Sequence, residues 1–119
     1  MSNDAQSQDD AVVELVLEVE KLDNWRVVHT FKKMQVKHIR EPAVNLMKIC
    51  MVLQLYQCPI TTHLIEAILE KQSRSTVALP SKLHNLGDKH CLILKRGARP
   101  SRGGHFEWII DPVFLEAYR

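Results

Sequence analysis

Apolar residues recur at helical spacing over most of this sequence. Between Asp10 and Leu22, valine and leucine residues return every three or four positions, and acidic side chains occupy the opposite face. This spacing predicts an amphipathic helix, for which Asp10 is a suitable N-terminal cap. A strand remains an alternative, because valine favours extended structure and some of these apolar residues also alternate along the segment.

Residues 24–40 have the least regular pattern. The apolar positions from Trp25 to Phe31 follow one another at intervals of three, which favours a helix with basic residues on its other face. A hairpin that turns near residues 32–33 is the alternative. The beginning of the chain, residues 1–9, is polar and acidic, and we expect it to be disordered.

Three further helices are predicted between residues 41 and 88. After Glu41 comes "PAVNLMKICMVLQLY", which opens with proline and is apolar on almost every side, as is typical of a central buried helix. The second helix begins at Thr61 or Thr62 and carries a leucine and isoleucine stripe. The third lies within "VALPSKLHNLGDKH", where Pro80 must fall in the first turn and Gly87 is a candidate terminator.

Two short segments near the C-terminus favour strands. They are "HCLILK" and "HFEWIID", and both are rich in residues that prefer extended structure. Antiparallel pairing through the basic loop between them, residues 95–104, is the economical arrangement. Asp111 followed by Pro112 then predicts the start of a last helical turn.

Composition places the chain among single-domain globular proteins. It has 119 residues, of which 45% are hydrophobic and 25% charged. No apolar run approaches the length of a membrane span, and the first residues lack the order of a signal peptide, so we expect a cytoplasmic protein. Cys50, Cys58 and Cys91 are odd in number and widely spaced, which argues against a disulfide framework.

Charge is distributed unevenly along the chain although the net charge is only +2. Residues 1–23 carry seven acidic side chains against the single base Lys21. Residues 71–105 carry eight lysines and arginines against the single acid Asp88. A positive region this concentrated indicates a negatively charged partner more strongly than the overall charge does.

The second half of the chain resembles a known class of DNA-binding protein. The stretch that carries the likeness is "ITTHLIEAILEKQSRSTVALPSKLHNLGDKHCLILKRGARPSRGGHFEWII". It is similar to the winged helix–turn–helix, and most of all to the MarR-type bacterial regulators. In that family a serine- and threonine-rich turn precedes a helix with two leucines three apart, and a strand, a basic wing and a second strand follow. The corresponding positions here are Ser75, Thr76, Leu83, Leu86, Leu92, residues 95–104 and Phe106–Ile110.

The resemblance departs from the family pattern at two positions. Pro80 falls where the recognition helix of the family is usually unbroken, and Gly87 lies four residues ahead of Cys91 instead of directly before the strand. The implied fold class is mainly α (α+β). It consists of a winged helix–turn–helix over residues 41–119, a helical dimerisation segment over residues 10–40, and the acidic tail.

The resemblance and the charge distribution together predict a protein that binds double-stranded DNA. Members of the family usually dimerise through helices outside the winged core, so we expect a homodimer through residues 10–40; the alternative is that these residues only complete the core of a monomer. The N-terminal side chains of a helix can read the major groove, while a basic arm reaches phosphates or the minor groove. The expected contacts of the recognition helix and its turn are Arg74, Ser75, Thr76, Ser81, Lys82, His84 and Asn85. The expected contacts of the wing are Lys95, Arg96, Arg99 and Arg102. For Ser81, Lys82 and Asn85, a merely solvated helix face stays an alternative.

The predicted function is that of a sequence-specific transcriptional regulator, such as a repressor, associated with the nucleoid. The alternatives are a winged-helix module that binds another protein, and a plasmid or phage replication or partition protein. We expect no enzyme activity, because no phosphate-binding glycine loop or nucleophile elbow is present. We also expect no cofactor and no metal, since the histidines and cysteines lack ligand spacing. The sequence identifies no small-molecule effector and no membrane partner.

Overall fold

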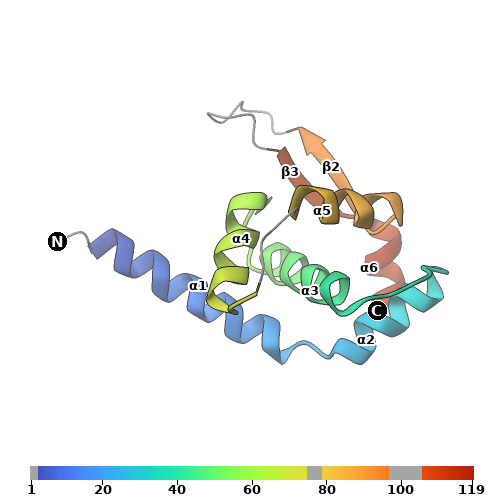
Figure 1. Ribbon diagram of the computed structural model, residues 1–119, viewed down its shortest axis with the longest axis horizontal. Coiled ribbons are helices and arrows are strands. Elements are labelled where there is room, and N and C mark those ends of the chain that lie inside the picture. The colour runs from blue at the N-terminus through green and yellow to red at the C-terminus, as the bar shows by residue number, and fades with distance from the viewer. Residues whose placement is uncertain (1–2, 75–78, 97–105) are drawn as a thin grey trace.

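The computed structural model describes residues 3–74, 79–96 and 106–119. These residues form a mainly helical structure with a small antiparallel sheet, in agreement with the predicted α+β class (Figure 1). The helices are α1 (Asn3–Lys21), α2 (Asn24–Lys33), α3 (Glu41–Leu55), α4 (Thr62–Lys71), α5 (Leu79–Asp88) and α6 (Pro112–Tyr118). The strands are β1 (Ile60–Thr61), β2 (Leu92–Arg96) and β3 (Phe106–Ile110). Among the described helices, none combines the length and the apolar character that crossing a membrane requires.

The prediction of a central buried helix is confirmed by α3. The helix starts at Glu41 with Pro42 in its first turn, where the missing N–H of proline costs no hydrogen bond. Every residue from Val44 to Cys50 is buried, and so are Val52 and Leu53. Because α3 is apolar on nearly all sides, it packs against α1, α2, α4 and α5 as well as β3.

The N-terminal segment is helical, as favoured over the strand alternative. The helix α1 begins at Asn3 and not at Asp10, so it includes most of the segment for which disorder is expected. Its inner face packs on α3 and α4 through Val19, which is fully buried, and through the partly buried Leu15. Figure 1 shows the first turns of α1 extending away from the rest of the molecule.

The second helix confirms the helical alternative for residues 24–33. Asp23 caps α2, because its Oδ1 accepts a hydrogen bond from the backbone N–H of Trp25 at 2.9 Å. The hairpin alternative is wrong, since residues 32–33 form the last turn of this helix. The chain then leaves the helix through Gln35 and His38, whose φ angles of 60° and 58° lie in the left-handed region.

The sheet has the strand order β1-β3-β2, with both pairs antiparallel. The predicted pairing of the two C-terminal strands is confirmed, in a register that places Arg96 opposite Phe106 and Leu92 opposite Ile110. The strand β1 is unpredicted, because two residues are too short to show any alternation. It pairs Ile60 with Trp108 and so joins the start of α4 to the sheet.

Gly87 does not end α5, contrary to prediction. The helix continues through it to Asp88, and the chain turns at His90, which has a φ of 62°. A Cβ atom at Gly87 would lie 3.2 Å from the backbone oxygen of Leu92 and 3.7 Å from the ring of Trp108. The glycine therefore allows α5 to pack closely on the sheet. Pro80 lies in the first turn, as predicted.

The last helix, α6, closes the molecule against α2. Arg26 donates from Nη2 to the backbone oxygen of Tyr118 at 3.0 Å, and Lys33 donates from Nζ to that of Ala117 at 3.1 Å. Both cations thus satisfy carbonyls at the C-terminal end of α6, where the helix dipole is negative. Phe114 packs in the same interface, and α2 therefore shares one core with the C-terminal helices.

Candidate nucleic-acid interface

The helix α5 presents a polar face to solvent. Its leucines, Leu79, Leu83 and Leu86, are at most 1% exposed and hold the helix against the core. The polar residues between them remain accessible, and they include four of the sequence-predicted contacts. Ser81, His84 and Asn85 are exposed and Lys82 is partly exposed. These four side chains therefore lie away from the buried leucines of α5.

His84 is exposed, yet its ring contacts another aromatic ring. Its ring meets the ring of Trp108 edge to face, with 5.2 Å between the ring centroids and an interplanar angle of 77°. Trp108 belongs to β3 and is itself buried. This contact fixes the flank of α5 that faces the strands, a role that the spacing of residues along the helix did not reveal.

Arg74 lies just after α4 and forms an ion pair. Its Nη1 is 3.3 Å from Oε1 of Glu41, the first residue of α3. Both side chains are substantially exposed, so the pair contributes little to stability and holds the guanidinium only loosely. Two other predicted contacts of this turn, Ser75 and Thr76, lie outside the described residues.

Of the basic residues predicted as wing contacts, the structure describes only Lys95 and Arg96. Lys95 is exposed on β2, directly opposite Glu107 of β3, and Arg96 is the last residue of β2. Two predicted wing contacts, Arg99 and Arg102, fall within residues 97–105, outside the part of the chain that the structure describes. Because Arg96 pairs with Phe106, that segment connects the ends of two adjacent strands.

A cavity of about 370 Å³ lies along the other flank of α5, next to the start of α3. Its lining is rich in cations, and among its lysine and arginine residues only Lys82 is a sequence-predicted contact. The lining residues are His38, Arg40, Pro42, Ala43, Leu46, Lys82, Asn85, Leu86 and Lys89. The spacing of Lys82, Asn85 and Lys89 on one stripe of the helix is visible in the sequence. The approach of residues 38–40 depends on the tertiary fold.

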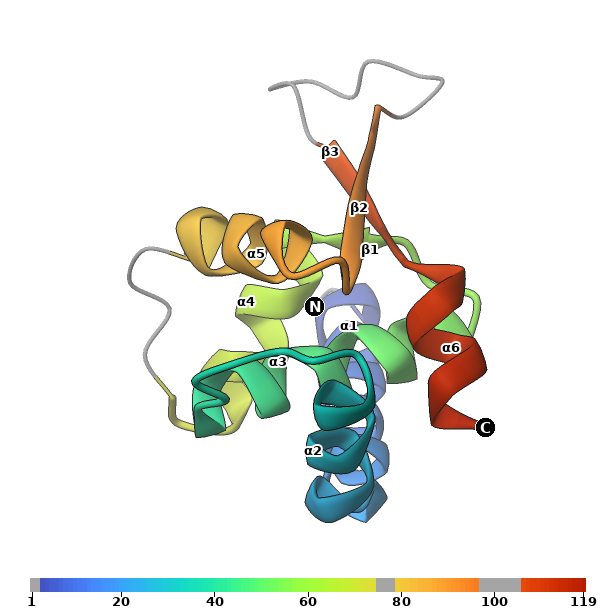
Figure 2. The same ribbon diagram turned by 90° about the vertical axis from the view of Figure 1, so that its right-hand side faces the viewer.

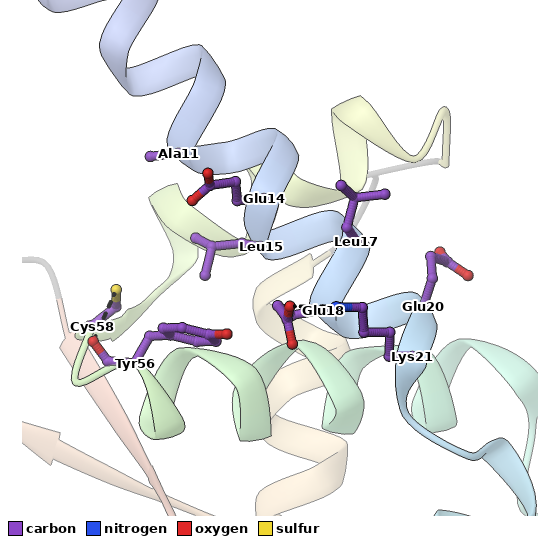
Figure 3. A pocket seen from close by; sticks show the side chains of 9 residues that line it. All are labelled: Ala11, Glu14, Leu15, Leu17, Glu18, Glu20, Lys21, Tyr56 and Cys58. Carbon is purple, nitrogen blue, oxygen red and sulfur yellow. Dashed lines mark hydrogen bonds and ion pairs between the residues drawn. The ribbon is translucent and has the colours of Figure 1, made fainter.

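A second cavity, of about 720 Å³, lies in the acidic N-terminal part of the molecule, between α1 and the end of α3 (Figure 3). Leu17 and Tyr56 border it and are 56% and 50% exposed. Lys21 donates from Nζ to Oε1 of Glu18 at 2.9 Å. This hydrogen bond lowers the pKa of Glu18 and raises that of Lys21. Partial burial raises the pKa of the Tyr56 hydroxyl, and the nearby Glu18 raises it further.

Two of the three cysteine thiols, those of Cys50 and Cys91, are buried in the core. Burial raises the pKa of Cys50 to about 12 and that of Cys91 to about 11, so both stay protonated and unreactive near neutral pH. Cys58 is partly exposed and unpaired. Over residues 3–74, 79–96 and 106–119, no group of three histidine, cysteine or carboxylate side chains is placed to hold a metal ion.

The described residues thus bring the polar face of α5, the cation-lined cavity and the basic end of β2 into one region. Polar side chains on an exposed helix together with lysine and arginine suit a polyanion, since they supply donors and positive charge. Comparison with protein-family models, curated proteins and solved structures found no match to this chain.

Proposed function

We propose that this protein is a winged helix–turn–helix protein that binds double-stranded DNA as a transcriptional regulator on the nucleoid. The observation that carries the proposal is the position of α5. This helix lies between α4 and β2 in the sequence, and β2 belongs to a sheet of strand order β1-β3-β2. The polar face of α5 remains exposed beside the β2–β3 pair. A helix followed directly by a two-stranded wing is the arrangement that the sequence resemblance implies.

In this proposal α5 enters the major groove. The groove is about 12 Å wide and admits one helix. Asn85 can donate to and accept from adenine, and Lys82 can donate to guanine. Both side chains lie on the accessible side of α5. Replacing Asn85 with Ala should therefore change the preferred DNA sequence, which a random-library selection would record.

The connection between β2 and β3 acts as the wing. Lys95 and Arg96 bring positive charge to its start, and the sequence adds Arg99 and Arg102. Arginine pairs with phosphate through two parallel hydrogen bonds and keeps its charge at any physiological pH. The wing therefore contributes affinity that does not depend on sequence.

The protein acts as a homodimer through its N-terminal helix α1. Val13 and Leu17 follow each other by one turn of α1 and are 44% and 56% exposed, which leaves an apolar stripe on an otherwise acidic helix. A second copy is a suitable cover, because two-fold symmetry brings the same patch from each chain together. A two-fold dimer also matches two half-sites separated by about one helical turn of DNA.

A salt titration tests DNA binding. Fluorescence anisotropy on a labelled duplex of random sequence should show affinity falling by about a hundredfold between roughly 50 and 200 mM salt, as about four phosphate contacts require. Absent binding, or binding that ignores salt, contradicts the proposal. A plasmid or phage replication or partition protein would give the same result, and only the identity of the selected DNA site separates those functions.

A winged-helix module that binds another protein is the second candidate. It is favoured by the exposure of Leu55 and Val113, at 72% and 61%, because large exposed apolar side chains mark interaction surfaces when they cluster. Leu55 borders a cavity that is also lined by Leu115 and Tyr118 of α6, and Val113 lies in the same helix α6. This candidate predicts no salt-dependent DNA binding, so the same titration separates it from the first.

A further inference from the structure

We infer that the cavity between α5 and the start of α3 is a second phosphate-binding site, which holds the DNA backbone on the flank of α5 opposite the wing. The inference rests on the proposed DNA-binding function and extends it to residues 38–40 and Lys89, which the sequence did not indicate. The ligand is the phosphodiester backbone of the duplex, recognised by charge and not by base sequence. Arg40 and Lys89 hold this phosphate, whereas Lys82 and Asn85, which also line the cavity, keep the base contacts proposed above.

The cavity is built from segments far apart in the sequence. One wall is a single stripe of α5, formed by Lys82, Asn85 and Lys89. The other is the first turn of α3 with the chain that leads into it, residues 38–40. The turn at His38, whose φ of 58° is in the left-handed region, starts this approach to α3. Figure 2 shows the connection from α2 to α3 running below α5.

The side chains that line the cavity include cations and no carboxylate. Glu41 follows Arg40 directly, but its carboxylate pairs with Arg74. Within the described part of the chain, Arg40, Lys82 and Lys89 form no ion pair. Cations that gather around one hollow without an internal partner repel each other, and a bound anion relieves this repulsion.

The floor of the cavity is apolar. Leu46 and Leu86 are 3% and 1% exposed, and Ala43 lies beside them. An apolar floor lowers the local dielectric, which strengthens the attraction between an anion and the cations at the rim. At about 370 Å³ the hollow accommodates one phosphodiester group with its water.

The position of the cavity relative to the wing identifies the ligand as DNA. A helix in the major groove has one phosphate backbone on each side. The contact of His84 with Trp108 defines the flank of α5 that faces the strands, and the stripe of Lys82 and Lys89 lies on the other flank. The wing therefore takes one backbone, and the cavity lies where the other backbone passes.

The inference is tested with the double variant Arg40→Gln and Lys89→Gln. Loss of two phosphate contacts should weaken binding to any duplex by about tenfold and should reduce the slope of log affinity against log salt by about two. The preferred DNA sequence should not change. The matched control is Lys21→Gln with Arg119→Gln, which removes the same charge from residues outside the cavity lining.

The possible outcomes distinguish a failure of this inference from a failure of the proposed DNA-binding function. If the wild-type protein shows no salt-dependent binding, the proposed function fails, and the inference with it. If the wild type binds and the cavity variant matches the control in affinity and slope, the inference alone is overturned. A changed sequence preference also overturns it, since it would make these residues base readers. Circular dichroism verifies folding, and the single variant Lys89→Glu, which should weaken binding further than Lys89→Gln, repeats the test should the double variant unfold.

Discussion

The surface around α1 and the surface around α5 differ in charge and in how they are built. The first is acidic with an exposed apolar stripe, and its charges come from one continuous helix. The second is basic and gathers its charges from α5, the end of β2 and the approach to α3. The net charge of +2 conceals both, because they nearly cancel. The spatial separation of charge is thus more informative about partners than its sum.

The difference in construction has a physical consequence. The surface of α1 depends on local helical geometry, so a substitution of one exposed side chain leaves its neighbours in place. The surface of α5 depends on packing of the helix against the sheet, through Gly87 and Trp108. We therefore expect the basic surface to be sensitive to core substitutions and the acidic surface to be insensitive to them.

The largest expected effect is that of Trp108→Ala. Trp108 is 4% exposed and packs near Gly87 and His84, so its truncation should lower the free energy of unfolding by about 3–5 kcal/mol. Glu14→Ala on the acidic surface removes an exposed side chain and should change the free energy of unfolding by no more than about 0.5 kcal/mol. Urea unfolding measures both. Equal losses in the two variants would show that the surfaces do not differ in construction.

The second expected effect concerns affinity for DNA. Arg99→Ala with Arg102→Ala should weaken binding to any duplex by about tenfold or more, because it removes two of the phosphate contacts that we propose for the wing. The matched change on the other surface, Asp10→Asn with Glu14→Gln, should leave affinity within about twofold, because long-range repulsion is screened by salt. Anisotropy titrations compare the pairs. A wing variant with wild-type affinity would show that the wing does not touch DNA.

The third expected effect concerns self-association through α1. Leu17→Glu places a charge in the proposed dimer interface, and it should raise the dissociation constant by about tenfold or more. Sedimentation at micromolar concentration measures this shift. Val113→Glu, which changes a similarly exposed apolar residue on α6, is the control and should leave the mass unchanged. A monomeric wild type, or a dimer broken only by the control, contradicts the assignment of the interface to α1.

Much of the helical framework was predictable from the sequence, since the periodicity of α3, α4 and α5 and the caps at Thr61 and Asp111 are local features. The end of α5 was mispredicted, because Gly87 is required for close packing and that reason is tertiary. Strand β1 was missed because two residues have no period. The cavity was missed since residues 38–40 reach α5 only through the path of the α2–α3 connection.

The smallest expected effect is a titration on the acidic surface. The hydrogen bond from Lys21 lowers the pKa of Glu18 below its usual value of 4.5. A carboxyl with a depressed pKa stabilises the folded state above the unfolded pKa, and this stabilisation is lost as the pH falls through the folded pKa. Lys21→Gln should therefore raise the titration midpoint of Glu18 toward 4.5, as followed by NMR of its side-chain carboxyl carbon. A Glu18 midpoint that stays in place would show that the ion pair does not persist in solution, and that the acidic surface lacks even this local order.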